Sequence, residues 1–321
     1  MRTKLREVRG LNWNAGAIMN SSWTRAPGLR AILARAGGTA LSASEPATAH
    51  VAFACHTPPL LLGGNLVRGQ ESPLSRALRE DGQVLLATAM NGAPLTPNHG
   101  YPVRVVAPGI AGARAVKWVD RITVQMGESE NVYMQRDYKI LPPEVRDSQQ
   151  AEGYWGRTPA VQEMPVNSAI AVPVEGGAAE RGDDGCVGVS GYAVPSGDEG
   201  PVTRVEVSAD GGQRWTEAEL LQYPEEGKWA WKLWRARVRV PEGIGKTTVY
   251  SRATDKAGNT QPERSQWNLR GVCYNGYGVA ADVMINPDDA GSMEERWHRE
   301  ENMFGAGGKG ALAWKWKWGT R

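Results

Sequence analysis

The sequence has few cysteines and no long apolar run. Its cysteines number three, lie far apart and include no Cys-x-x-Cys pair: Cys55, Cys186 and Cys273. This spacing supports neither a zinc site nor a disulfide scaffold and favours a reducing compartment. No apolar run approaches the roughly 18 residues that span a bilayer, and the basic opening MRTKLREVRG lacks the apolar core of a secretory signal. We therefore expect a soluble globular protein that does not enter a membrane.

The sequence also lacks an excess of charge of one sign. Its 37 Lys and Arg residues and 35 Asp and Glu residues leave a net charge of +2. Because proteins that bind nucleic acid usually carry a strong basic excess, nucleic acid is not expected as the main partner. Catalytic Ser-His-Asp motifs, Walker loops and GxGxxG fingerprints are absent as well. Any binding of an anion must therefore depend on a local cluster of basic residues.

The first half of the chain has a mixed α and β pattern. Leu29, Ile32 and Leu33 form a one-sided apolar stripe that predicts a helix ending before Gly37. The apolar run at 84–86 predicts a buried strand, and the runs at 103–106 and 122–124 predict two further strands. Residues 141–165 are rich in proline and poor in apolar residues, which indicates a connector between domains.

The pattern beyond the connector is all-β. Val205 and Val207 alternate with charged residues before a Gly-rich turn, as expected for a strand with one buried face. Apolar residues change phase between Leu233 and Trp234, which predicts a β-bulge. Short alternating strands separated by turns favour a β-sandwich. We expect domains at 1–160 and 161–285, followed by a disordered tail at 286–321 that ends in alternating Trp and Lys.

Residues 90–139 hold the densest group of candidate functional side chains. One His, two Arg and one Lys lie among glycines: His99, Arg104, Arg114 and Lys117. Each alone has an ordinary structural explanation, such as a surface histidine or an arginine that pairs with a carboxylate. Together, with glycines that allow close approach of backbone N–H groups, they predict a site for an anionic, phosphate-bearing ligand.

These residues belong to a string that resembles the sulfite oxidase family. MNGAPLTPNHGYPVRVVAPGIAGARAVKW is the most characteristic segment, and it is shared in part with eukaryotic nitrate reductases. Further matches are SGYAV (190–194), VEVSADGGQRW (205–215), KWAWKLW (228–234) and QPERSQWNLRGV (261–272). The resemblance implies an α+β protein: an incomplete mixed α/β molybdopterin-binding domain followed by an immunoglobulin-like dimerisation domain.

The family resemblance implies a molybdopterin cofactor and assigns residues to it. His99 and Arg104 match positions that hold the pterin and its phosphate. Ala115, Val116 and Lys117 match a segment whose backbone and lysine also contact the cofactor.

The resemblance also implies a substrate pocket. Tyr138 matches a tyrosine beside the metal, and Arg270 matches an arginine that holds the sulfite anion. An interdomain salt bridge is the structural alternative for Arg270, and the two roles are compatible. Nitrate reductases usually have methionine at the position of Arg270 and a different sequence at 134–139, so both positions here have the sulfite oxidase form.

The cysteine that ligates molybdenum in this family lies in a Cys-Ala-Gly-Asn-Arg-Arg motif, just upstream of a segment resembling residues 2–13. Because this sequence begins at Met1, that ligand is expected upstream of it, and no metal ligand is assigned here. A gene-model error, an alternative start and a true truncation all explain this. A haem group would fit only on a further N-terminal domain. Cys55 is expected to be a small buried residue rather than a substitute ligand.

The resemblance thus implies an oxidoreductase that converts sulfite to sulfate and forms a homodimer through its β-sandwich. A nitrate reductase-type protein and an inactive fragment remain as alternatives. The electron acceptor, a cytochrome or oxygen, and the compartment, whether cytoplasm, peroxisome or mitochondrion, are left open by the sequence.

Overall fold

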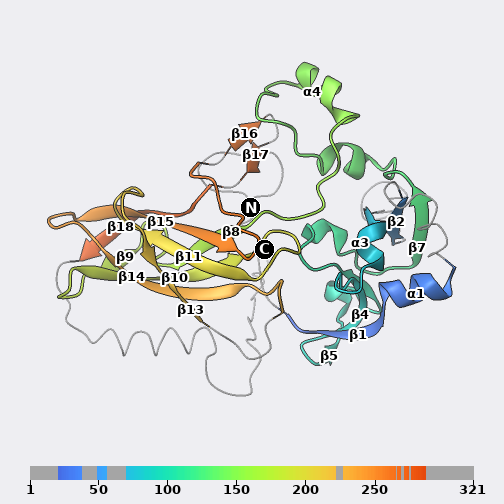
Figure 1. The fold of residues 1–321 in the computed structure, drawn as a ribbon, viewed down its shortest axis with the longest axis horizontal. Coiled ribbons are helices and arrows are strands. Elements are labelled where there is room, and N and C mark those ends of the chain that lie inside the picture. Colours follow the sequence, from blue (N-terminus) through green and yellow to red (C-terminus); the bar gives the residue numbers. More distant parts are fainter. Residues whose placement is uncertain are drawn as a thin grey trace, which may run out of the picture.

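A computed structural model describes residues 21–37, 49–55, 70–221, 227–264, 266–268, 271–274 and 276–286. Two regions follow each other along the chain (Figure 1): a mixed region of short helices and small sheets, and a β-sandwich. The predicted α+β class is therefore confirmed. Apart from Asn286, the predicted tail lies outside the described residues.

The mixed region contains two small antiparallel sheets. One sheet has the order β1-β4-β5 with β6 also paired to β4, and the other has the order β3-β2-β7. The elements are β1 (Trp23–Gly28), α1 (Leu29–Arg35), β2 (Ala49–Ala54), β3 (Gln70–Pro73), α3 (Leu74–Leu78), β4 (Leu85–Met90), β5 (Ala93–Pro94), η3 (Pro97–His99), β6 (Arg104–Val106), η4 (Gly112–Arg114), β7 (Arg121–Met126), η5 (Tyr133–Asp137) and α4 (Ser148–Trp155).

The core of the mixed region follows from the apolar pattern. Strand β2 alternates between buried and half-buried residues, and Val51 and Phe53 are fully buried. Helix α1 turns Leu29 and Leu33 onto the same core, as the apolar stripe predicted. Cys55 is a buried member of this core. Leu86 of β4 and Val105 of β6 belong to the same core, which fixes the sheet that carries β6.

Residues after β7 form a small separate cluster. Leu141, Val145 and Ala151 are buried together, with Trp155 packed against them. Helix α4 is capped at its N-terminus by Asp147, whose side chain accepts a hydrogen bond of 2.8 Å from the Gln150 N–H. The connector predicted at 141–165 therefore contains a capped helix that the scarcity of apolar residues concealed.

The second region is a sandwich of two sheets. One has the order β13-β14-β10-β8 and the other β12-β11-β15-β18-β9, and a separate hairpin joins β16 to β17. The strands are β8 (Asn167–Val172), β9 (Ala178–Glu180), β10 (Cys186–Val194), β11 (Val202–Ser208), β12 (Thr216–Glu217), β13 (Glu219–Leu221), β14 (Lys232–Arg239), β15 (Lys246–Asp255), β16 (Gln266–Asn268), β17 (Gly271–Tyr274) and β18 (Gly278–Asn286).

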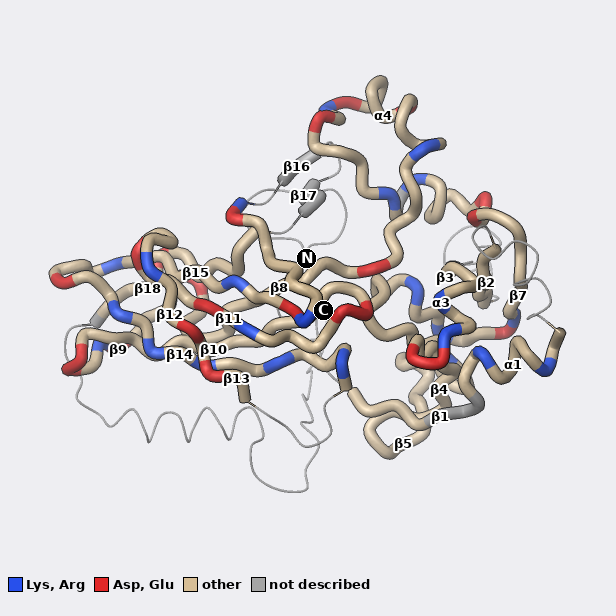
Figure 2. Tube along the Cα trace, viewed as in Figure 1, with Lys and Arg blue, Asp and Glu red and all other residues tan. Residues whose placement is uncertain are grey.

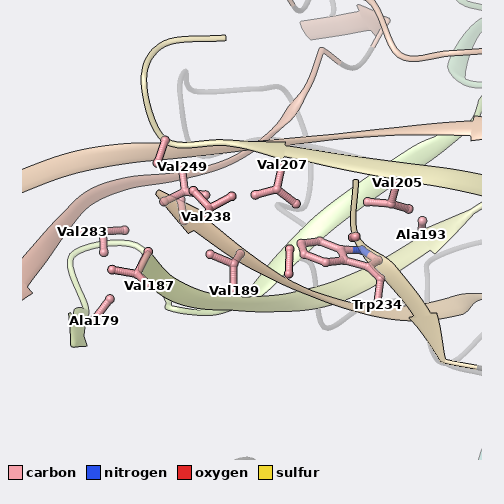
Figure 3. Close-up of a cluster of buried hydrophobic side chains, with 14 of the residues drawn as sticks. Ala179, Val187, Val189, Ala193, Val205, Val207, Trp234, Val238, Val249 and Val283 are labelled. Atoms are coloured by element: carbon pink, nitrogen blue, oxygen red, sulfur yellow. The ribbon is translucent and has the colours of Figure 1, made fainter. Parts of the chain in front are cut away.

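The sandwich core is built mainly from valines around one tryptophan. Figure 3 shows Trp234 on β14 among Val189 of β10 and Val205 and Val207 of β11, so both sheets contribute to it. Trp234 is 1% exposed. Alternate residues of β14 and β15 are buried, which is the packing that the period-two pattern predicted.

The β-bulge predicted between Leu233 and Trp234 is wrong. Strand β14 pairs with β10 without any shift of register, with Leu233 opposite Tyr192 and Trp234 opposite Gly191. Leu233 packs on the outer face of its sheet with Ala169 and Tyr192, whereas Trp234 enters the core. Both faces of this strand carry apolar side chains, and that produced the apparent change of phase.

The two regions are joined by a buried polar contact. Arg76 lies 3.5 Å from Asp198 and donates a hydrogen bond of 3.1 Å to the Pro108 carbonyl oxygen, and its guanidinium lies over the Trp229 ring. Lys228 and Asp81 form a second ion pair of 3.3 Å. These contacts hold the mixed region against one end of the sandwich.

Acidic and basic residues are interspersed along the described chain (Figure 2). Among the described residues, no helix is long and apolar enough to cross a membrane. Because the two signs of charge are interspersed and the net charge is only +2, an anion site must arise from a few basic residues brought together locally.

Candidate functional site

A short 3₁₀ turn presents His99 at the surface. Turn η3 begins with Pro97, whose fixed φ suits the first position of a helix, and it ends at Gly100 with φ +105°. The Nδ1 atom of His99 lies 2.7 Å from the Thr96 hydroxyl. This contact occupies one ring nitrogen and orients the imidazole.

Gly100 brings Arg104 and Lys117 together. A Cβ atom at this position would lie 2.9 Å from the Lys117 Cβ and 3.1 Å from the Arg104 Cβ, so only glycine leaves room for both. Lys117 Nζ donates a hydrogen bond of 2.8 Å to the Asn98 carbonyl oxygen. Arg104 Nη1 donates one of 3.1 Å to the His99 carbonyl oxygen. The predicted residues His99, Arg104 and Lys117 therefore form one basic cradle.

Arg104 has unused capacity to bind an anion. Its Nε is buried without a hydrogen-bond partner, and no carboxylate in the described part of the chain lies within ion-pair distance. The guanidinium carbon lies 4.9 Å from the centre of the Trp23 ring, which covers one face. Burial lowers the pKa of Arg104 below its ordinary value. A buried donor of this kind is costly unless a ligand accepts its hydrogen bond, so a phosphate-bearing group fits the cradle.

The segment 115–117 is fixed beside this cradle by its main chain. The Val105 N–H donates to the Val116 carbonyl oxygen at 2.9 Å, and the Ala115 N–H donates back to Gly112 at 3.1 Å. The Val116 side chain is buried in the core of the mixed region. The main chain of Ala115 and Val116 is thus held in place, and Lys117 is the residue of this segment with a polar side chain.

Trp118 was missed as a contributor by reasoning from sequence. Its φ is +55°, and its indole Nε1 donates a hydrogen bond of 2.8 Å to the Pro97 carbonyl oxygen. This bond ties the end of the 115–118 segment to turn η3. A left-handed tryptophan has no signal in the sequence pattern, although the residue lies within the family-like string.

Tyr138 lies at the end of an unusual turn. Its N–H donates to the Tyr133 carbonyl oxygen at 2.9 Å, the five-residue spacing of the π-helical turn η5. Such turns are rare and occur often at functional sites. The Tyr138 ring is half-buried, and the guanidinium carbon of Arg114 lies 5.1 Å from its centre. Arg114 directly precedes Ala115, so its side chain links Tyr138 to the segment 115–117.

Arg270 lies outside the described residues. Strands β16 and β17 stand on either side of it in the sequence, and they are paired with each other, with Asn268 opposite Gly271.

Among the described residues, no group of three or more His, Cys, Asp and Glu side chains is arranged to hold a metal ion. Cys186 is a free thiol, and burial raises its pKa.

These features define a two-region α+β protein whose first region carries a basic cradle formed by His99, Arg104 and Lys117. Residues 1–133 match the family described as the oxidoreductase molybdopterin binding domain. Residues 158–281 match the Mo-co oxidoreductase dimerisation domain. The chain therefore carries the binding domain for a molybdenum cofactor.

Comparison with known proteins gives the same assignment. Human mitochondrial sulfite oxidase is 41% identical over 281 residues, 86% of this chain and 48% of that protein. Arabidopsis thaliana sulfite oxidase is 39% identical over 84% of this chain and 69% of its own length. A nitrate reductase [NAD(P)H] of Hordeum vulgare is 37% identical over 84% of this chain and 31% of its own length.

A solved structure has a similar fold. The sulfane dehydrogenase SoxCD of Paracoccus pantotrophus superposes with a TM-score of 0.58 and 26% identity, covering 82% of this chain and 61% of that one. This chain belongs to the sulfite oxidase family of molybdopterin oxidoreductases. It spans about half the length of the mouse and human relatives that it matches.

Proposed function

We propose that the complete protein oxidises sulfite to sulfate with a bound molybdenum cofactor. The observation that carries this proposal is the cradle around Gly100, where Arg104 and Lys117 approach each other and the Arg104 Nε lacks a partner within the described chain. A phosphorylated pterin supplies the acceptors that such donors need. The identity of 39–41% with sulfite oxidases supports sulfite as the substrate.

In this proposal the cradle residues hold the cofactor. Arg104 offers a planar fork of donors to the phosphate, and Lys117 offers a compact positive charge. His99 contacts the pterin through the ring nitrogen that Thr96 leaves unused. When bound, the molybdenum cofactor would supply the two-electron redox change and the oxygen atom that sulfur receives.

Two further residues act on the substrate in this proposal. Arg270 binds the sulfite anion through its permanent charge, and the Tyr138 hydroxyl donates a hydrogen bond that orients it. The net reaction converts sulfite and water to sulfate, two electrons and two protons. The electrons pass to a cytochrome or to oxygen. We also propose that the mixed domain ends near residue 160 and that the sandwich forms a homodimer, which its family match supports.

Nitrate reduction is the second candidate, because the Hordeum vulgare enzyme is almost as similar as the sulfite oxidases. The arginine at position 270 favours sulfite, because nitrate reductases usually have methionine there. An inactive fragment is the third candidate, since the ligating cysteine of the family is not assigned to any residue of this sequence.

Turnover assays on the purified protein separate these candidates. Molybdenum and pterin content are measured together with sulfite-dependent reduction of cytochrome c or oxygen and with nitrate reduction by a reduced dye. Sulfite turnover with no nitrate turnover supports the proposal, whereas the reverse contradicts it. Lack of both activities and of molybdenum, restored by an N-terminal extension that carries the cysteine motif, would identify the chain as a fragment.

The substitution Arg270→Met tests the pocket itself. Because a small anion would lose its main charged contact, the KM for sulfite should rise about a hundredfold. Pterin content should stay at the wild-type level. An unchanged KM would remove Arg270 from the substrate pocket.

A further inference from the structure

Arg114 is a buried cation for which the proposed reaction has no role so far. Its side chain is 1% exposed, although it lies on the short turn η4. Arginine is almost never buried to this extent unless fixed partners surround the guanidinium. The partners of Arg114 therefore show what this side chain holds in place.

The guanidinium joins two separate parts of the chain. Nε and Nη2 both donate to the carbonyl oxygen of Val161, at 3.2 and 2.5 Å. Nη1 contacts the sulfur of Met134, which is fully buried in turn η5. Arg114 thus fixes the connector after α4 and the turn that ends at Tyr138.

Tyr138 is held by the same residues. Its ring centre lies 5.1 Å from the guanidinium carbon of Arg114, and its carbonyl oxygen accepts a hydrogen bond of 2.7 Å from the Val161 N–H. Arg114 and Val161 are themselves hydrogen-bonded. Ring and main chain of Tyr138 are therefore fixed by two residues that fix each other, and this closed arrangement leaves the ring little freedom to turn.

Arg114 directly precedes the segment 115–117, so its contacts also connect that segment to Tyr138. Ala115 follows Arg114 directly, and Val116 is hydrogen-bonded to the strand that carries Arg104. A shift of the guanidinium would therefore move the Tyr138 ring relative to the cofactor segment. Small errors of this kind in the placement of a reacting group lower turnover strongly.

We propose that Arg114 is a positioning residue that holds the Tyr138 ring in register with residues 115–117. The inference rests on the proposed function, because it gives Tyr138 a substrate to orient. Arg114 does not contact substrate in this account. It acts through the ring that it covers and through the Val161 carbonyl group that it binds.

The substitutions Arg114→Met and Arg114→Lys test this role. Methionine removes the charge and the donors, whereas lysine keeps a charge but lacks the planar fork that binds Val161 and lies over the ring. Both should lower kcat for sulfite about tenfold or more, with KM and pterin content within about twofold of wild type. If the methionine variant does not fold, the kcat of the lysine variant decides whether Arg114 positions Tyr138.

A second readout does not depend on turnover. Nitration of Tyr138 by tetranitromethane, quantified by peptide mass spectrometry against the exposed Tyr101, reports how well the ring is covered. Both variants should raise this ratio about threefold or more, because the guanidinium that covers the ring is lost.

Arg157→Met is the matched control. Arg157 lies over the Tyr154 ring at 4.0 Å, the same kind of contact at an exposed position. This variant should raise nitration of Tyr154 and leave kcat and nitration of Tyr138 unchanged.

The outcomes separate this inference from the proposed function. Unchanged nitration of Tyr138 in both Arg114 variants, or increased nitration with unchanged kcat, overturns the positioning role. Loss of pterin would assign Arg114 to cofactor binding instead and also overturns it. If the wild-type protein has no sulfite turnover even when extended at its N-terminus with the cysteine motif, the proposed function fails, and the nitration ratio alone decides whether Arg114 holds the ring.

Discussion

Gly109 of the mixed region and Gly197 of the sandwich are in direct contact: a Cβ atom on Gly109 would lie 2.0 Å from the Gly197 carbonyl oxygen. Met164 is hydrogen-bonded to both glycines. Its N–H donates to the Gly109 carbonyl oxygen at 3.1 Å, and its carbonyl oxygen accepts from the Gly197 N–H at 2.8 Å. The end of the connector thus lies in a main-chain junction between the two regions. This junction leaves no space for a side chain.

Gly109→Ala should therefore destabilise the protein more than an alanine in an open turn. The positive φ of +74° costs about 1–2 kcal/mol for alanine, and the contact with main-chain atoms adds about 1–3 kcal/mol. Gly127→Ala is the control, since Gly127 has φ +76° and a Cβ atom there would meet nothing within 4 Å. Urea unfolding measures the free energy of unfolding of both variants. Equal losses of this free energy would show that the junction tolerates a side chain.

Removal of the Arg76 charge tests the polar contact between the regions. Arg76 is 7% exposed and bonded to Asp198 and Pro108. Because Arg79 stays within 2.6 Å of Asp198, the loss for Arg76→Met should be moderate, about 1–3 kcal/mol in the free energy of unfolding. Arg30→Met, which breaks an exposed pair with Glu80, should cost about 0.5 kcal/mol or less. Similar values for the two variants would contradict the assignment of Arg76 to the interface.

Gly100→Ala should damage the cradle without touching any of its charged groups. The added Cβ pushes against Lys117 and Arg104, so pterin content should fall about tenfold or more. Gly92→Ala has the same kind of positive φ, +77°, with nothing within 4 Å, and should keep its cofactor. Normal pterin content in the Gly100 variant would show that the close approach of the two basic residues is not needed for binding.

Tyr192 should make the stability of the sandwich depend on alkaline pH. Burial raises its pKa to about 12 from an ordinary value of 10.0, because the phenolate is penalised in the fold. The unfolded chain loses this proton first, so the stabilisation is complete below pH 10 and is lost between pH 10 and about 12. The loss is at most roughly 1.4 kcal/mol per pH unit. Urea unfolding of Tyr192→Phe should show a weaker decline in this range, and parallel curves for the two proteins would contradict the shift.

The sandwich could be predicted from sequence because its strands alternate with period two. Val205 and Val207 fall on one face of β11, as their spacing requires. The same rule failed at Leu233 and Trp234, because a second apolar cluster covers the outer face of β14. Periodicity identifies a strand with one buried face, but it does not separate a bulge from a strand with both faces covered.

The basic cradle could be predicted because its residues lie close together in one string. His99 and Arg104 are five residues apart, and the main-chain hydrogen bond from Val105 to Val116 holds Lys117 next to them. The linkage of Arg114 to Tyr138 was not visible, because it depends on a π-helical turn and on a carbonyl group at position 161. Neither feature leaves a pattern in the side chains of one sequence.

The pterin content of Lys117→Ala tests the central claim most directly. The claim is that the residues around Gly100 bind the phosphorylated pterin, so this variant should hold about one tenth of the wild-type amount or less. Lys246→Ala, which removes an exposed lysine paired with Asp282 at 2.8 Å, should hold the wild-type amount. The pterin is released, oxidised and quantified by fluorescence per mole of folded chain. Wild-type content in the Lys117 variant would contradict the cradle and the oxidase assignment that depends on it.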